Sequence, residues 1–278
     1  MMRVGIIGLG LIGGSMAKAL SAKHTIYGAD LRQDVMEEAL NSHVLTAALD
    51  EKTIGTCELI LLGLFPQRAV DYVREHAEQF QKGAIVVDLC GVKRVVEAGI
   101  LPVAEAHGFH YIGGHPMAGL ARVGWEYSRG DLFQNASMIL VPHSDTAPEV
   151  LETVRRVVMD AGFGNIAIST AEEHDYMIAY TSQLAHVLSS AYVKTPAAQR
   201  HRGFSAGSFR DMTRVAWLNE DMWTELFLDN PDYLAEEVEG LAARLLEYAM
   251  AIRGGDSEGL RRLLREGRER KEALEDRE

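Results

Sequence analysis

Cysteine is scarce in this sequence, with only Cys57 and Cys90 among 278 residues. Two cysteines provide neither a disulfide framework nor a paired metal-ligand pattern, so we expect a reducing compartment, the cytoplasm. No apolar run reaches the roughly 18 residues that span a bilayer. The N-terminus lacks the basic segment, continuous apolar block and cleavage site of a signal peptide. We therefore expect no membrane as a partner.

Basic residues are also few. The chain has 28 Lys and Arg against 40 Asp and Glu, a formal net charge of −12. Nucleic acid is therefore not expected as a partner, because phosphate binding needs a basic surface. An acidic protein can still bind a small anion in a locally positive pocket, so the arginines and histidines are the residues of interest.

Short apolar runs alternate with amphipathic segments up to about residue 169, which predicts a parallel sheet covered by helices on both faces. The expected strands span residues 3–7, 25–28, 59–63, 85–88, 110–112, 138–141 and 165–168. The expected helices span residues 12–22, 33–41, 67–80, 94–107 and 148–161.

Strand signals stop after Ser169, and the rest of the chain reads as helical. The expected helices cover residues 172–193, 210–218, 221–228, 232–253 and 258–275. Thr170 followed by Glu173 is typical of a capping box, and Pro231 suits the first position of a helix. The sequence thus predicts an α/β domain over residues 1–169 and an all-α domain over residues 170–278.

A glycine fingerprint directly follows the first expected strand and opens a helix. Gly8 permits a tight turn, Gly10 lets the backbone approach a pyrophosphate, and Gly13 lets helix and strand pack closely. The helix N-terminus favours the negative charge of the phosphates. This is the pattern of a Rossmann doubly wound sheet. We assign to cofactor binding Gly8, Leu9, Gly10, Leu11, Ile12 and Gly13.

Asp30 ends the second expected strand, where a carboxylate accepts hydrogen bonds from the adenosine ribose hydroxyls. A 2′-phosphate there would meet like-charge repulsion, so the sequence favours NAD over NADP. Arg32 is the alternative signal, because a nearby arginine can accommodate that phosphate. Leu64, after the third long strand, is expected to line the cofactor.

A histidine among glycines, His115 in Gly113-Gly114-His115-Pro116-Met117-Ala118-Gly119, follows the fifth expected strand. Parallel strands of this fold gather ligands at their carboxyl ends. Histidine titrates near pH 6.5 and can take a proton from a hydroxyl. Spacing alone leaves open whether His115 is a base or a loop histidine satisfied by local hydrogen bonds.

The fingerprint, the His115 segment and Phe209-Arg210-Asp211-Met212-Thr213-Arg214 together resemble the prephenate dehydrogenase family, which includes arogenate dehydrogenases. The resemblance covers about residues 2–255 and implies a Rossmann domain followed by a helical domain that forms a homodimer. It implies NAD-dependent oxidative decarboxylation of prephenate to 4-hydroxyphenylpyruvate, a step in tyrosine biosynthesis. His115 matches the catalytic histidine, which helps remove the proton of the ring hydroxyl.

The resemblance also implies the groups that hold the dicarboxylate. Arg214 matches the arginine that binds a substrate carboxylate, and guanidinium suits that role because it binds carboxylate bidentately. His186 matches a histidine that faces the substrate. Gly207 matches a position near the pocket. Arg210 lies four residues before Arg214, on nearly the same helix face, and either contacts substrate or pairs with nearby carboxylates.

Three positions depart from the family pattern, and one of them, Ala185, replaces a proline. Gly91 stands where the family often has a serine whose hydroxyl contacts the catalytic histidine and the ligand, so a water or the Gly91 N–H would have to substitute. Gln183 replaces a histidine and cannot carry charge. Lys93 either positions ligands or faces solvent. His174 matches a family histidine near the domain junction and either serves the site or stabilises the helix start.

Several functions remain open. Prephenate and arogenate differ only in a keto or amino group, which the sequence does not separate. A 3-hydroxyacid dehydrogenase or imine reductase would usually place a lysine in the helix over residues 172–193, where this sequence has none. A non-catalytic NAD-binding redox sensor would need no positioned base. Without a His-Glu-x-x-His motif or a close ligand pair, we expect no metal.

Overall fold

The computed structural model describes residues 1–120 and 122–275. The chain forms two compact units, Met1–Asn230 and Pro231–Glu278. The helices that follow residue 170 therefore share the first unit with the sheet as far as Asn230, and the domain boundary expected after residue 169 stays a prediction. None of the helices in the described ranges is long and apolar enough to cross a membrane.

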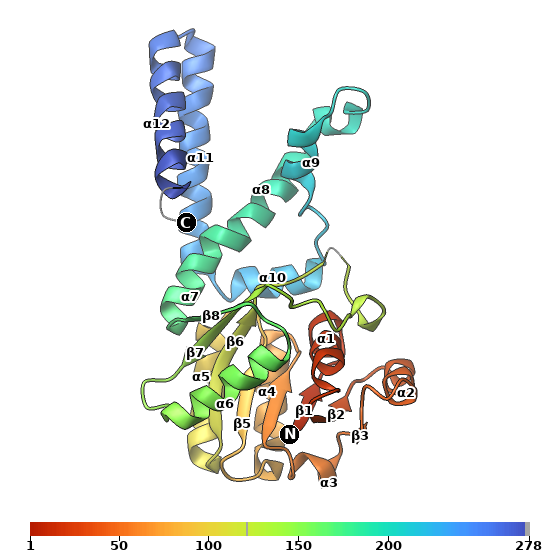
Figure 1. The fold of residues 1–278 in the computed structure, drawn as a ribbon. Coiled ribbons are helices and arrows are strands. Elements are labelled where there is room, and N and C mark those ends of the chain that lie inside the picture. The colour runs from red at the N-terminus through yellow and green to blue at the C-terminus, as the bar shows by residue number, and fades with distance from the viewer. Residues whose placement is uncertain (121, 276–278) are drawn as a thin grey trace. The chain divides into compact units, whose positions relative to one another are not determined.

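The sheet has eight strands in the order β3-β2-β1-β4-β5-β6-β7-β8, and helices cover both of its faces (Figure 1). The strands are β1 Arg3–Ile7, β2 Thr25–Ala29, β3 Ala47–Ala48, β4 Leu59–Leu62, β5 Ile85–Asp88, β6 His110–Pro116, β7 Ser137–Pro142 and β8 Asn165–Ile168. The expected Rossmann sheet is confirmed, with two corrections. The expectation missed β3, and β7 runs antiparallel to β6.

Helices bury both faces of the sheet. Neighbouring residues of a strand point to opposite faces, so each strand contributes to two apolar clusters. In β4, Leu59 and Leu61 belong to one apolar cluster, while Ile60 and Leu62 belong to the other. Helices α1 (Leu11–Leu20), α2 (Gln33–Asn41) and α6 (Pro148–Asp160) contribute to the first cluster. Helices α4 (Pro66–His76) and α5 (Arg94–His107) contribute to the second. The short α3 spans Glu51–Ile54.

The segment expected as one helix over residues 172–193 is interrupted by a wider turn. Helix α7 (Ala171–Ile178) passes through a π-helical turn at Ala179–Gln183 into α8 (Leu184–Val193). Such a turn shifts the helix face relative to a continuous α-helix and often occurs at functional sites. The Thr170 hydroxyl accepts the Glu173 N–H at 3.2 Å, so Thr170 caps the helix as expected. The Glu173 carboxylate accepts the Ser169 hydroxyl at 3.3 Å, so among residues 122–275 only the Thr170 half of the predicted capping box is recorded.

Two further helices complete the first unit. Helix α9 spans Gly207–Thr213 and α10 spans Glu220–Leu228. The second unit consists of α11 (Pro231–Gly254), which begins at the proline as predicted, and α12 (Ser257–Glu275). These two helices are linked by a hydrogen bond from the Tyr248 hydroxyl to the Leu263 carbonyl at 3.2 Å.

Candidate active site

The glycine turn after β1 is built as the fingerprint predicts. Gly8 has φ of +81°, a left-handed conformation that favours glycine. A Cβ on Gly13 would lie 1.9 Å from the Gly8 carbonyl oxygen, so only glycine fits between α1 and the turn. A Cβ on Gly10 would meet nothing within 4 Å, which leaves open space beside the N-terminus of α1. The turn can therefore take a phosphate group against its backbone.

Asp30 stabilises this turn and borders a cleft. Its carboxylate accepts the Leu9 N–H at 2.7 Å and the Arg32 N–H at 2.8 Å. The cleft, of about 410 Å³, is lined by Gly8, Gly10, Asp30 and Leu64. Phe65, from the same segment expected to line the cofactor, also borders it, and so do Arg68 and Tyr72, which the sequence did not single out. Arg68 and Tyr72 lie on α4, the helix that directly follows the end of β4, and this position after a strand end could have indicated them.

Four other predicted cofactor residues have different surroundings. The side chains of Leu9 and Leu11 are buried, so only their backbone can serve a ligand, and Ile12 packs against the same core. The Arg32 guanidinium is bound by two carboxylates, at 2.6 Å from Asp34 and 2.7 Å from Glu126. This pairing opposes its use for a 2′-phosphate and agrees with the preference for NAD.

Four strand ends meet at one edge of the sheet. Strands β1, β4, β5 and β6 are mutually parallel neighbours, so their carboxyl ends lie side by side. They lead to Gly8, to Leu64, to Gly91 and to His115 respectively. The structure therefore places the predicted base and the glycine turn on the ligand-binding edge of the sheet.

His115 lies within β6 and not in a loop, which corrects the expectation that the strand ends at residue 112. It pairs with Ile139 of β7 in the antiparallel register. The glycines before it allow close packing. A Cβ on Gly114 would lie 2.6 Å from the Asp88 carbonyl oxygen. The glycines that looked like a loop are required by the neighbouring strand.

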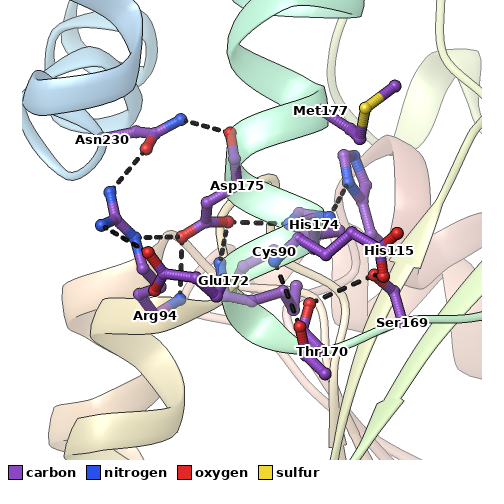
Figure 2. Close-up of polar contacts among 12 residues, drawn as sticks. Cys90, Arg94, His115, Ser169, Thr170, Glu172, His174, Asp175, Met177 and Asn230 are labelled. Atoms are coloured by element: carbon purple, nitrogen blue, oxygen red, sulfur yellow. Dashed lines mark hydrogen bonds and ion pairs between the residues drawn. The ribbon is translucent and has the colours of Figure 1, made fainter.

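A chain of hydrogen bonds links His115 to a carboxylate on α7 (Figure 2). His115 Nδ1 lies 2.8 Å from His174 Nε2, and His174 Nδ1 lies 2.7 Å from Asp175 Oδ1. The side chains of His174 and Asp175 are completely buried. Spacing left the role of His174 open and Asp175 was missed, although a carboxylate next to a histidine at a helix start is a visible signal.

Burial sets the protonation of both rings. Burial lowers the pKa of His115 well below its usual value, and the nearby His174 and Lys93 lower it further. Burial also lowers the pKa of His174, although the hydrogen bond to Asp175 opposes that shift. Burial alone would raise the pKa of Asp175, but hydrogen bonds from His174 and from the N–H groups of Lys93 and Arg94 lower it. Both imidazoles are therefore neutral at pH 7, and Asp175 is ionised.

Lys93 does not face solvent. Its ammonium forms an ion pair with Asp88, and both side chains are completely buried. Asp88 also accepts the Tyr111 hydroxyl at 2.8 Å and the Cys90 N–H at 2.9 Å. This pair therefore braces the end of β5 beside the site and leaves Lys93 no part in ligand binding.

Gln183 also has a structural place. Its side-chain amide donates to the Leu226 carbonyl at 2.8 Å and accepts from the Asn230 side chain at 2.8 Å. Asn230 in turn donates to the Asp175 carbonyl at 2.8 Å and accepts from Arg94 at 2.8 Å. The buried glutamine thus connects the π-turn to α10.

The other predicted substrate residues lie on α8, on α9 and directly after α9. The His186 ring lies 3.9 Å from the Trp223 ring, centroid to centroid. Burial lowers the pKa of His186, and Arg214 is close enough to lower it further. Within residues 1–120 and 122–275, Arg210 and Arg214 form no ion pair, so both exposed guanidinium groups are available to an anion. Gly207 begins α9, and a Cβ there would meet open space.

Helix α10 connects these residues to the sheet edge. Leu226, three residues after Trp223, packs toward Gly91, where a Cβ would lie 3.1 Å from the Leu226 side chain. Residues three apart are neighbours on a helix face. Glu225 accepts the Gln67 N–H at 2.8 Å. Helix α10 thus links His186 to Gly91 through Trp223 and Leu226. No direct contact between His115 and Arg214 is recorded in the described part of the chain.

Among the described residues, no group of three His, Cys, Asp or Glu side chains could hold a metal ion. The Rossmann sheet, the glycine turn and the carboxylate at the end of β2 define a dinucleotide-binding oxidoreductase. The family model for the prephenate dehydrogenase nucleotide-binding domain matches residues 14–166, more than half of the chain. The prephenate dehydrogenase dimerization domain matches residues 170–266. The chain belongs to the prephenate dehydrogenase family.

Individual relatives agree over nearly the full length. Prephenate dehydrogenase of Lactococcus lactis is 28% identical, covering 99% of this chain and 78% of that protein. Cyclohexadienyl dehydrogenase of Zymomonas mobilis is 30% identical, covering 98% of this chain and 95% of that protein. A crystal structure of A. aeolicus prephenate dehydrogenase in complex with hydroxyphenyl propionate and NAD+ is 26% identical, with a TM-score of 0.86 and coverage of 99% and 98%.

Proposed function

We propose that this chain is an NAD-dependent prephenate dehydrogenase that converts prephenate to 4-hydroxyphenylpyruvate in tyrosine biosynthesis. The observation that carries the proposal is a half-buried, neutral histidine, His115, at the same sheet edge as a dinucleotide-binding turn. The family and the names of its relatives supply the substrate class. The helical region acts in a homodimer, in line with the matched dimerization domain. The cytoplasmic location expected from the cysteine content stays a prediction.

The residues around the glycine turn fit NAD. The open space at Gly10 leaves room for a pyrophosphate, and Asp30 presents a carboxylate to the ribose hydroxyls. Leu64 lines the same cleft, whereas Arg32 is held by its two carboxylates. When bound, NAD+ supplies the hydride acceptor for the ring carbon that carries the hydroxyl.

His115 acts as the base for that ring hydroxyl. As the C–H bond breaks, the hydroxyl proton moves to the free ring nitrogen of His115, leaving a ring ketone. Loss of carbon dioxide then returns an electron pair to the ring and gives the aromatic product. The oxygen takes the proton back from His115, so the reaction releases no net proton. A neutral histidine is required at the start, which agrees with its lowered pKa.

Cationic groups hold the substrate, because prephenate carries two carboxylates. Arg214 binds one of them bidentately, and Arg210 adds positive charge from the same short segment. His186, stacked against Trp223, contributes a neutral hydrogen-bonding ring. The N–H of Gly91 takes the place of a serine hydroxyl near the substrate. An acidic protein can in this way bind a dianion through a local positive patch.

The test is NADH formation by the purified enzyme with NAD+ and either prephenate or arogenate. We expect NADH absorbance to rise with prephenate, and the paired kcat/KM values define the preference between the two substrates. Activity with neither substrate, in a protein that still binds NAD, would refute the proposal and would favour a binding protein that senses redox state.

A further inference from the structure

The hydrogen-bond chain behind His115 determines which of its nitrogens carries the proton. Asp175 is ionised and accepts from the Lys93 N–H at 2.8 Å and the Arg94 N–H at 2.9 Å, as well as from His174. A carboxylate surrounded by donors can only accept. The proton between Asp175 and His174 therefore resides on His174 Nδ1.

His174 then has one arrangement open to it. A neutral imidazole carries a single N–H, so His174 Nε2 is a lone-pair acceptor. The atom 2.8 Å from it, His115 Nδ1, must be the donor. His115, itself neutral, is left with its lone pair on Nε2. The opposite arrangement would need a charged His174, which burial disfavours.

We propose that His174 and Asp175 are positioning residues that fix the tautomer of His115, so that Nε2 is always the free proton acceptor. The proposal rests on the proposed function, because it is the substrate hydroxyl that needs this acceptor. Gly91 at the end of the neighbouring strand has no side chain with which to hold the ring. His174 and Asp175 come instead from α7, and both are completely buried, so the ring is held rigidly.

The tautomer can be read directly, without substrate. In full-length protein labelled with 15N-histidine, NMR spectra distinguish a ring nitrogen that carries hydrogen from one that does not. We expect His115 and His174 both to carry hydrogen on Nδ1 at pH 7, with signals assigned by loss in His115→Asn and His174→Phe. Hydrogen on Nε2 of His115 would overturn the proposal even if the dehydrogenase activity were established.

Kinetics provide the second readout. His174→Phe removes the acceptor, so His115 can take either tautomer. We expect kcat to fall about 10- to 100-fold, the scale seen when a metal-bound histidine loses its hydrogen-bond partner, with KM for prephenate changed less than about 3-fold. His174→Gln retains an amide oxygen that can accept from Nδ1, so it should keep more activity than His174→Phe. A folded His174→Phe enzyme with unchanged kcat would refute the positioning role.

A matched control exists elsewhere in the same unit. His24 is also buried and lies 3.1 Å from a carboxylate oxygen, that of Asp160. His24→Phe therefore removes a contact between a buried histidine and a partly exposed aspartate that has no connection with the site. We expect it to leave kcat unchanged. An equal loss of kcat in both variants would show a general packing effect and would overturn the proposal.

Discussion

Replacing Lys93 with Met tests whether its ion pair with Asp88 braces the carboxyl edge of the sheet. Methionine has a similar length and no charge. Both partners are completely buried in the structure. In the variant, Asp88 keeps hydrogen bonds from the Tyr111 hydroxyl at 2.8 Å, from the Cys90 N–H at 2.9 Å and from the Gly114 N–H at 3.4 Å. It loses the cation that balances its charge.

The expected cost follows from that imbalance. Removing one partner of a buried ion pair typically lowers the free energy of unfolding by about 3–5 kcal/mol. Replacing both partners with neutral residues costs less, because no charge is left without a counter-ion. Lys93→Met combined with Asp88→Asn should therefore be more stable than Lys93→Met alone. Asp88 also accepts the Gly114 N–H, and Gly114 is adjacent to His115. A shift of Asp88 in Lys93→Met should therefore move His115 and lower kcat.

Urea unfolding followed by circular dichroism measures these differences as shifts of the midpoint at constant slope. Lys23→Met is the control, since Lys23 forms an exposed ion pair with Asp160 at 3.1 Å and should leave the midpoint nearly unchanged. A loss below about 1 kcal/mol in Lys93→Met, or a double variant less stable than the single, would refute the reasoning.

Three further predictions concern substrate, pH and cofactor. Arg214→Ala should raise KM for prephenate about 10- to 100-fold with little change in kcat, and Arg214→Lys should recover part of the loss; an unchanged KM would exclude Arg214 as the anchor. Because the pKa values of His115 and His174 are both lowered, kcat/KM should stay level down to about pH 6.5 and fall only below it, and a fall that begins above pH 7 would contradict this. The free energy of unfolding should also decrease below about pH 6.5, because the unfolded chain binds these protons at a higher pH than the folded chain does. The charged groups that face the two rings are Lys93, Asp88 and Asp175. Glu126→Gln loosens Arg32 and should raise the NADP+ to NAD+ ratio of kcat/KM about 2- to 5-fold; a constant ratio would show that the pairing has no influence on cofactor choice.

Features encoded by neighbouring residues could be predicted from the sequence. The strand over residues 3–7, the glycine turn and the carboxylate of Asp30 form one local unit, and each has a clear physical requirement. Helix α5, Arg94–His107, was predicted to the residue, because its apolar positions repeat at helical spacing and Gly108 ends it in a left-handed conformation.

Features that depend on distant neighbours could not be predicted. The direction of β7 is set by its pairing with β6, and its own apolar pattern is the same in either direction. Glycines 113 and 114 resembled a loop because the residues that crowd them are distant in the sequence. The Asp88 carbonyl of β5 lies beside Gly114, and the Lys93 and Val141 side chains lie beside Gly113. The two-residue β3 is too short to show any periodicity.

The site was predicted in part for the same reason. His115 stood out because it lies among glycines after a strand. The carboxylate at the end of its hydrogen-bond chain did not, because Asp175 is 60 positions away in the sequence. The buried Lys93–Asp88 pair did not either, because lysine and aspartate are usually exposed. Lys93 and Asp88 are buried only because they neutralise each other. The π-turn could not be seen in a sequence that fits an unbroken helix, although it changes which faces His174 and His186 occupy.

The most direct test of the account is the turnover of His115→Asn with prephenate and NAD+. Asparagine can hydrogen-bond the substrate hydroxyl but cannot accept its proton. We predict that kcat falls about 10²- to 10⁴-fold while KM for prephenate stays within a few fold, the usual scale for a positioned base. A folded His115→Asn enzyme with wild-type kcat would contradict the account.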